Sequence, residues 1–246
     1  MEPKNKVRVF SNPSALAEGA SRLIIDIAAE AITSRGKFVI SLSGGRTPEQ
    51  LYTLLSRPPF RDQVSWDKVF VFWGDERCVP FDDEQSNAGM AQRTLLDNVG
   101  IPPENIYRVP VQLSPDEAAS EYEKTIKQFF GKDSPCFDLI LLGLGENGHT
   151  ASLFPGSDVI FDDARLVREV YVAEQKMFRI TMTAHLINLA RNILFLVEGQ
   201  EKAEILKTIF TAPFQPERYP AQLIKPAQSE LYWYADSAAA ASIKEG

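Results

Sequence analysis

The chain has 246 residues, of which 44% are hydrophobic and 24% charged, and its net charge is −7 at pH 7. This composition is typical of a globular protein, and the length predicts a single domain over residues 1–246. The negative charge argues against nucleic acid binding, and no apolar run is long enough to predict a signal peptide or a membrane span. We therefore expect a cytoplasmic protein that binds neither nucleic acid nor membrane.

The two cysteines, Cys78 and Cys136, lack the paired spacing of a zinc site, so we expect both to be reduced and structural. No metal is implied. In so acidic a chain, any anionic substrate must be captured by a local cluster of positive groups.

Short β-type runs alternate with amphipathic helical runs along the whole chain. Several β-type runs are apolar on both faces, as parallel strands are when helices cover both sides of a sheet. Helix starts are readable at Asn12-Pro13 and at residues 114–117, where a capping box precedes a helix stopped by Gly131. The pattern predicts an α/β fold with a doubly wound, mostly parallel sheet and helices on both faces, which is Rossmann-like. The expected strands span residues 7–10, 37–42, 68–73, 137–143, 179–183, 192–197 and 231–235.

In such sheets the functional residues lie beyond the carboxyl ends of the strands, and the first candidate is SGGRTPEQ at residues 43–50. The two glycines allow a tight turn, and we expect Thr47 to cap the next helix, with Pro48 in its first position and Gln50 completing a capping box. An ordinary strand-to-helix turn is the alternative. We favour an anion site, because two glycines exceed what a cap needs and helix amino termini suit phosphate. The candidate residues are Ser43, Gly44, Gly45, Arg46 and Thr47.

The second candidate is WGDER, residues 73–77, expected as a polar loop after a strand. A carboxylate at Asp75 beside the guanidinium of Arg77 could orient a catalytic group or hold a phosphate. A solvated charged loop is the alternative, and the position after a strand favours a site.

The third candidate is GLGENGHTASLFPG, residues 143–156, which contains a literal G-x-G-x-x-G. A dinucleotide site needs a long helix next, and Pro155-Gly156 interrupts it, so we reject that interpretation. The segment instead presents His149, whose ordinary pKa of about 6.5 suits a base near neutral pH. We interpret His185, the other histidine, as structural. Arg179 and Lys202 lie at element ends, where each could reach a phosphate.

Taken together, SGGRTP, WGDER, GLGENGHTASLFPG, RITMT and VEGQEKA resemble the 6-phosphogluconolactonase family, in order, from about residue 38 to 234. The resemblance implies hydrolysis of 6-phospho-D-glucono-1,5-lactone to 6-phospho-D-gluconate, in the oxidative pentose phosphate pathway, without a cofactor. It also implies the fold of the related glucosamine-6-phosphate deaminases. Two alternatives stay open: an enzyme resembling those deaminases, and a non-catalytic sugar-phosphate-binding protein.

Two positions distinguish this chain within the resemblance. The family usually has Asp where this chain has Asn147, which cannot act as a carboxylate beside His149, so Asp75 becomes the expected partner. Deaminases of this type resemble GHIAFNEPG, with a Glu where this chain has Phe154, which favours the lactonase.

The resemblance also implies roles for the individual residues. His149 deprotonates a water, Arg77 or loop N–H groups stabilise the oxyanion, and Asp75 orients His149 or a substrate hydroxyl. The substrate and its phosphate are bound by Ser43, Gly44, Gly45, Arg46, Thr47, Asn147, Gly148, Arg179 and Lys202.

Overall fold

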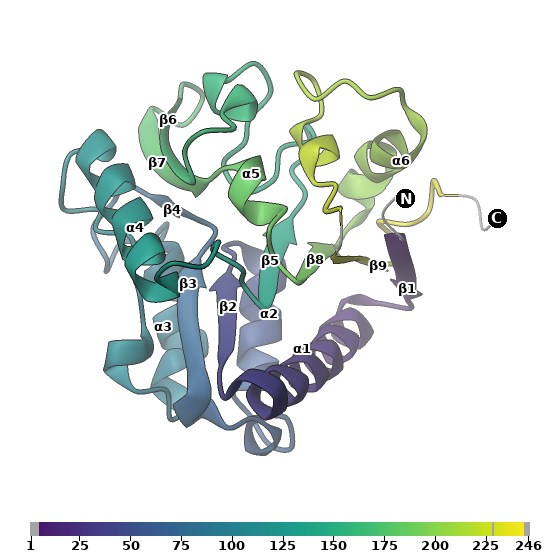
Figure 1. The fold of residues 1–246 in the computed structure, drawn as a ribbon. Coiled ribbons are helices and arrows are strands. Elements are labelled where there is room, and N and C mark those ends of the chain that lie inside the picture. The colour runs from purple at the N-terminus through teal and green to yellow at the C-terminus, as the bar shows by residue number, and fades with distance from the viewer. Residues whose placement is uncertain (1–4, 228, 244–246) are drawn as a thin grey trace.

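The computed structural model describes residues 5–227 and 229–243, and its centre is a six-stranded parallel sheet (Figure 1). The interior strands β2, β5 and β8 are almost wholly buried, which explains their continuous apolar sequences. The strand order is β1-β9-β8-β5-β2-β3. The bounds are β1 Asn5–Phe10, β2 Phe38–Leu42, β3 Val69–Trp73, β5 Leu139–Gly143, β8 Asn192–Val197 and β9 Glu230–Asp236.

Two of the three helix starts that were predicted from capping residues are confirmed. Asn12 caps α1 through the N–H of Ala15, and Ser114 and Glu117 form the capping box of α4, which ends at Gly131. The tilted rings of Phe129 on α4 and Phe70 on β3 pack 5.3 Å apart, joining the helix to the sheet. The bounds are α1 Pro13–Arg35, α2 Arg46–Leu55, α3 Asn87–Thr94, α4 Pro115–Phe130, α5 Ala184–Ile187 and α6 Ala203–Thr211.

The prediction for the start of α2 is wrong. The helix begins at Arg46 with Gly45 as its N-cap, and Thr47 forms no cap. Gly45 has φ +100°, a conformation that glycine adopts freely, so the chain turns into the helix two residues earlier than a Thr cap requires. Pro48 is tolerated because the third N–H of a helix has no partner within it.

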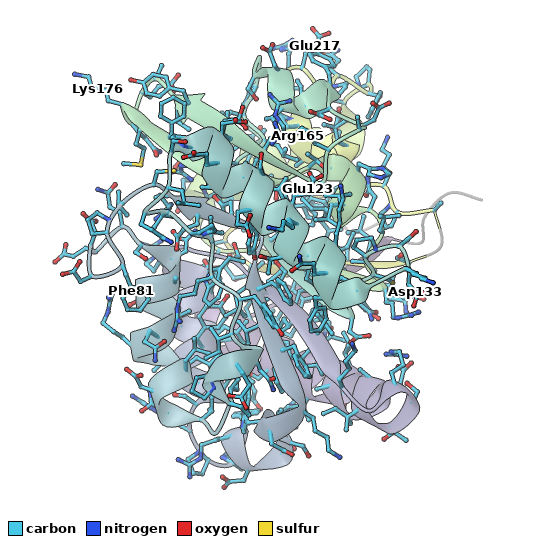
Figure 2. All side chains as sticks on the ribbon, turned by 60° about the vertical axis from the view of Figure 1, so that its left-hand side comes forward. Phe81, Glu123, Asp133, Arg165, Lys176 and Glu217 are labelled. Atoms are coloured by element: carbon cyan, nitrogen blue, oxygen red, sulfur yellow. The ribbon has the colours of Figure 1, made fainter. Side chains whose placement is uncertain are left out.

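A second, antiparallel sheet of order β4-β7-β6 lies beside the first (Figure 1). β7, Met177–Met182, was expected from the sequence, whereas β4, Asp75–Arg77, was expected as a loop and β6, Val167–Val172, was missed. A three-residue strand has no readable periodicity, and β4 is a strand only because it pairs with β7 about a hundred residues later. Figure 2 labels Glu123 on α4, and its carboxylate accepts hydrogen bonds from the N–H groups of Leu166 and Val167, which joins this helix to the second sheet.

The strand order reverses between β2 and β5, since β3 lies on one side of this pair and β8 on the other. Ligands of doubly wound sheets bind at this switch point, beyond the carboxyl ends of the strands. Ser43 follows β2 there, and the loop after Gly143 follows β5. The predicted fold class is confirmed. Within the described ranges, no helix is both long and apolar enough to cross a bilayer.

Candidate active site

A cavity of about 230 Å³ lies at the switch point, and we call it the carboxyl-edge cavity. It receives residues from the ends of β2 and β5, from β4 and β7 of the small sheet, and from α3. The residues that line it are Ser43, Gly44, Asp75, Arg77, Asn87, Gly143, Leu144, Gly145, His149, Ala151, Arg179 and Lys202.

His149 is held in the loop after β5 by contacts on several sides. Its Nδ1 lies 2.5 Å from Oδ1 of Asn147, and its ring stacks on Phe154 with centroids 4.3 Å apart. Gly145 makes room for the ring, because a Cβ at that position would lie 2.0 Å from Nδ1. With Nδ1–H donating to Asn147, Nε2 is the nitrogen left with a free lone pair.

Burial lowers the pKa of His149 to about 4. The charge of Asp75 acts in the opposite direction, while the nearby cations Arg179, Lys202 and Arg77 lower the pKa further. The imidazole is therefore neutral at pH 7, which is the form that accepts a proton.

Asp75 is buried and supports Arg179 rather than His149. Its Oδ2 accepts a 2.6 Å hydrogen bond from the hydroxyl of Ser152 and lies 3.4 Å from Nη1 of Arg179. Arg179 also donates to Oε1 of Gln175 and lies over the ring of Phe154. Asp75 was expected to become the partner of His149 in place of Asn147. In the structure Asn147 keeps its contact with Nδ1, and Asp75 acts on the imidazole through its charge while its Oδ2 contacts Ser152 and Arg179.

Three cations line the cavity against one carboxylate, Asp75. Arg77 and Arg179 are directly opposite each other on β4 and β7, which places their side chains on one face of the small sheet. Nη1 of Arg77 donates to the carbonyl of Gln85, and Nζ of Lys202 lies 3.8 Å from the exposed Glu146. The positive cluster that an acidic chain needs for an anionic substrate is present.

The helix α2 begins directly after two residues of the cavity. Ser43 and Gly44 line the cavity, and within residues 5–227 and 229–243 no side chain caps the helix. Free N–H groups at a helix amino terminus favour an anion. Arg46, expected as a further cation there, is instead exposed and lies 3.9 Å from Glu198 and 3.7 Å from Glu201.

The structure thus brings Ser43, Gly44, Asp75, Arg77, His149, Arg179 and Lys202 to one cavity, as expected from the sequence. Gly45, Arg46, Thr47, Asn147 and Gly148 do not line it, although Asn147 bonds His149. Asn87 and Ser152 were missed. Asn87 lies twelve residues beyond Asp75 and Ser152 reads as a residue of a flexible loop, so neither position carries a sequence signal.

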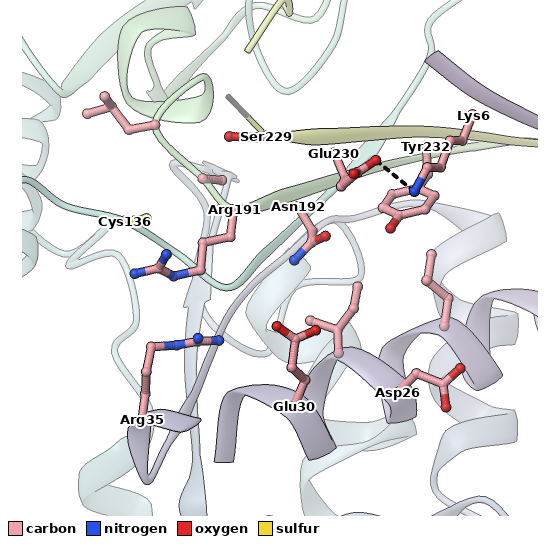
Figure 3. A pocket seen from close by; sticks show the side chains of 14 residues that line it. Lys6, Asp26, Glu30, Arg35, Cys136, Arg191, Asn192, Ser229, Glu230 and Tyr232 are labelled. Carbon is pink, nitrogen blue, oxygen red and sulfur yellow. Dashed lines mark ion pairs between the residues drawn. The ribbon is translucent and has the colours of Figure 1, made fainter. Parts of the chain in front are cut away.

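A larger cavity of about 650 Å³ lies where β8 and β9 begin, and we call it the amino-edge pocket. Figure 3 shows Arg35, Arg191 and Glu30 in it, and Lys6 pairs with Glu230 at 2.8 Å. Its charged lining residues balance, with Lys6, Arg35 and Arg191 against Asp26, Glu30 and Glu230.

Comparisons with known proteins agree with the motifs. The family described as "Glucosamine-6-phosphate isomerases/6-phosphogluconolactonase" matches residues 11–233. A 6-phosphogluconolactonase of Synechocystis sp. is 41% identical over 97% of this chain and 98% of its own length.

Solved structures agree as well. The 6-phosphogluconolactonase from Trypanosoma cruzi has a TM-score of 0.88 and 30% identity, covering 100% of this chain and 99% of its own. A monomeric glucosamine-6-phosphate deaminase, 22% identical with a TM-score of 0.82 over 96% of this chain and 99% of its own, shares the fold. The resemblance seen in the motifs is confirmed, and the chain belongs to the glucosamine-6-phosphate isomerase/6-phosphogluconolactonase family.

Proposed function

We propose that the chain hydrolyses 6-phospho-D-glucono-1,5-lactone to 6-phospho-D-gluconate, the lactonase step of the oxidative pentose phosphate pathway. The observation that carries the proposal is a neutral histidine, His149, in a cavity lined by three cations and one carboxylate. The names of the relatives that cover nearly the whole chain support it.

In the reaction we propose, Nε2 of His149 accepts a proton from a water molecule as the water oxygen bonds to the lactone carbonyl carbon. Arg77 or an N–H group of the Gly143–Gly145 loop stabilises the oxyanion that forms. The bond between the carbonyl carbon and the ring oxygen then breaks, and the ring oxygen leaves as a hydroxyl with the proton that His149 carried.

The phosphate is proposed to lie between the amino end of α2, Arg179 and Lys202. Ser43 and Gly44 line this side of the cavity, and Asp75 with Ser152 fixes the guanidinium of Arg179. Asn147 orients His149 through Nδ1. Arg46 points to Glu198 and Glu201, so we give it no phosphate contact.

Phe154 favours the lactonase over a deaminase. Its ring stacks on His149, in the position where the resemblance to deaminases requires an acid for opening an amino sugar. We further propose that the protein acts in the cytosol, which two free cysteines, Cys78 and Cys136, support.

The experiment that tests the function follows acid release from freshly prepared 6-phosphogluconolactone, with the spontaneous rate subtracted. Because Arg179 and Lys202 are proposed to bind the phosphate, we expect unphosphorylated gluconolactone to have a kcat/KM lower by about 100-fold or more. Equal kcat/KM values for the two lactones would refute the phosphate site, and ammonia release from glucosamine 6-phosphate would show a deaminase instead.

A further inference from the structure

We infer that Asn87 recognises a ring hydroxyl of the substrate in the carboxyl-edge cavity, an inference that rests on the proposed function. Asn87 is the first residue of α3 and its side chain is 2% exposed, yet it lines the cavity beside Ser43, Asp75 and His149. A polar side chain this deeply buried needs a hydrogen-bonding partner for each end of its amide.

The amino end of α3 is fixed by a buried carboxylate. Glu76 accepts hydrogen bonds from the N–H groups of Arg77, Asn87 and Ala88 at 2.7 to 2.8 Å. Ser86 caps the helix through the N–H of Gly89. The backbone of Asn87 therefore has one position relative to β4, on which Asp75 and Arg77 lie.

The side-chain amide of Asn87 is fixed in turn. Its Nδ2 donates to the backbone carbonyl of Asp75 at 2.9 Å, which sets the rotation of the amide. Within residues 5–227 and 229–243, its Oδ1 accepts no hydrogen bond. One end of the amide is thus satisfied by the protein, and the other is an acceptor that no donor of the described residues uses.

Gly44 allows this acceptor to reach the cavity. A Cβ at Gly44 would lie 1.8 Å from Oδ1 of Asn87 and 2.3 Å from its Cγ, so the amide packs directly on the glycine backbone. Gly44 follows β2 on the side where we place the phosphate. Asn87 therefore lies between the phosphate-binding turn and Asp75.

The other polar groups of the cavity indicate which kind of ligand Oδ1 of Asn87 would bind. Arg77, Arg179 and Lys202 are donors, suited to a phosphate and a carbonyl oxygen, whereas a sugar hydroxyl also donates and needs an acceptor. Of the two carboxylate oxygens of Asp75, Oδ2 is taken by Ser152 and Arg179, so Asp75 keeps one charged acceptor, Oδ1. Asn87 offers a neutral, oriented oxygen for a hydroxyl of the lactone ring.

The test combines removal of the Asn87 side chain with removal of single hydroxyl groups from the substrate. Wild type and Asn87→Ala are assayed on 6-phosphogluconolactone and on its 2-deoxy, 3-deoxy and 4-deoxy analogues. For one analogue we expect the wild-type kcat/KM to fall by about 10- to 100-fold, because a buried acceptor is left unpaired. Asn87→Ala should show the same loss with the full substrate and little further loss with that analogue.

A matched variant and a comparison on wild type alone separate recognition from folding. Asn105→Ala removes another buried asparagine that donates to a backbone carbonyl, that of Asp67, and should keep the wild-type sensitivity to every analogue. The comparison of the three analogues on wild type needs no variant, so it still tests the inference if Asn87→Ala does not fold.

Two results would overturn the inference: equal analogue penalties in wild type and Asn87→Ala, or a wild type indifferent to all three analogues. Failure of wild type to hydrolyse the full substrate would instead refute the proposed function.

Discussion

The two edges of the parallel sheet each carry a charged cavity, and they use charge differently. The amino-edge pocket is the larger, about 650 Å³ against about 230 Å³ for the carboxyl-edge cavity. Its three cations face three acids, whereas the carboxyl-edge cavity has three cations and one acid. In a chain with net charge −7, the smaller cavity is the one with a charge excess suited to an anion.

The arginines of the amino edge are engaged with the protein itself. The buried carboxylate of Asp138 lies 2.9 Å from Nη2 of Arg35 and 3.5 Å from Nε of Arg191, and its other oxygen accepts from the N–H of Val39. This group joins α1 to the starts of β2 and β8. The comparison teaches that an excess of positive over negative side chains, rather than cavity size, distinguishes the candidate active site.

The largest expected effect separates the two histidines. Replacing His149 with Ala should lower kcat by roughly 10²- to 10⁴-fold with little change in KM, because the base is lost while the phosphate contacts remain. His185→Ala is the matched control, since His185 is exposed on α5 and outside the cavity. Steady-state kinetics on both variants measure this, and an unchanged kcat in folded His149→Ala would remove His149 from the mechanism.

A smaller effect is expected when one lysine of each cavity is replaced with Met and kcat/KM is compared. Lys202→Met removes one of the two cations that we place around the phosphate, so kcat/KM for the phosphorylated lactone should fall about 10-fold or more, mainly through KM. Lys6→Met removes a cation from the amino-edge pocket, where it pairs with Glu230, and should leave kcat/KM unchanged. Equal losses in the two variants would mean that the charge difference between the cavities has no functional meaning.

The smallest effect concerns the pH profile of the carboxyl-edge cavity. With the pKa of His149 lowered to about 4 by burial, the base is neutral above that pH, so kcat/KM should fall only as the pH drops through about 4. Asn147→Asp places a carboxylate beside Nδ1, which favours the imidazolium and should move this fall to higher pH.

The measurement is kcat/KM across the acidic range after subtraction of spontaneous hydrolysis, with recovery of activity on return to pH 7 as the folding control. An acid limb at the same pH in Asn147→Asp and wild type would contradict the proposed hydrogen bond between Asn147 and His149.

Sequence patterns predicted the features that depend on residues close together in the chain, namely buried strands and helix caps. Strands β2, β5 and β8 were readable because they are buried on both faces. The caps of α1 and α4 were readable because Asn12 and Ser114 bond to their own first turns. The start of α2 was misread, since Thr47 and Pro48 fit a cap that the left-handed Gly45 makes unnecessary. A capping pattern is only one of several ways for a chain to enter a helix.

The site was predictable where residues follow strands of the parallel sheet. Ser43, Gly44 and His149 could be placed because the carboxyl ends of parallel strands meet at one edge. Asn87 and Ser152 could not, because each reaches the cavity through partners far along the chain: Glu76 and Gly44 for the first, Asp75 and Arg179 for the second.

The sequence by itself determined the alternation of strands and helices, the glycine-rich turns and the histidine, since these depend on side-chain size, periodicity and backbone freedom. Only the tertiary structure decided which cations reach the cavity. Arg46 and Arg179 look alike in the sequence, yet the first is exposed near Glu198 and Glu201 while Asp75 fixes the second inside the cavity. The reason is physical: the position of a charged group depends on what lies within a few ångströms of it, and pairing between distant segments sets those neighbours.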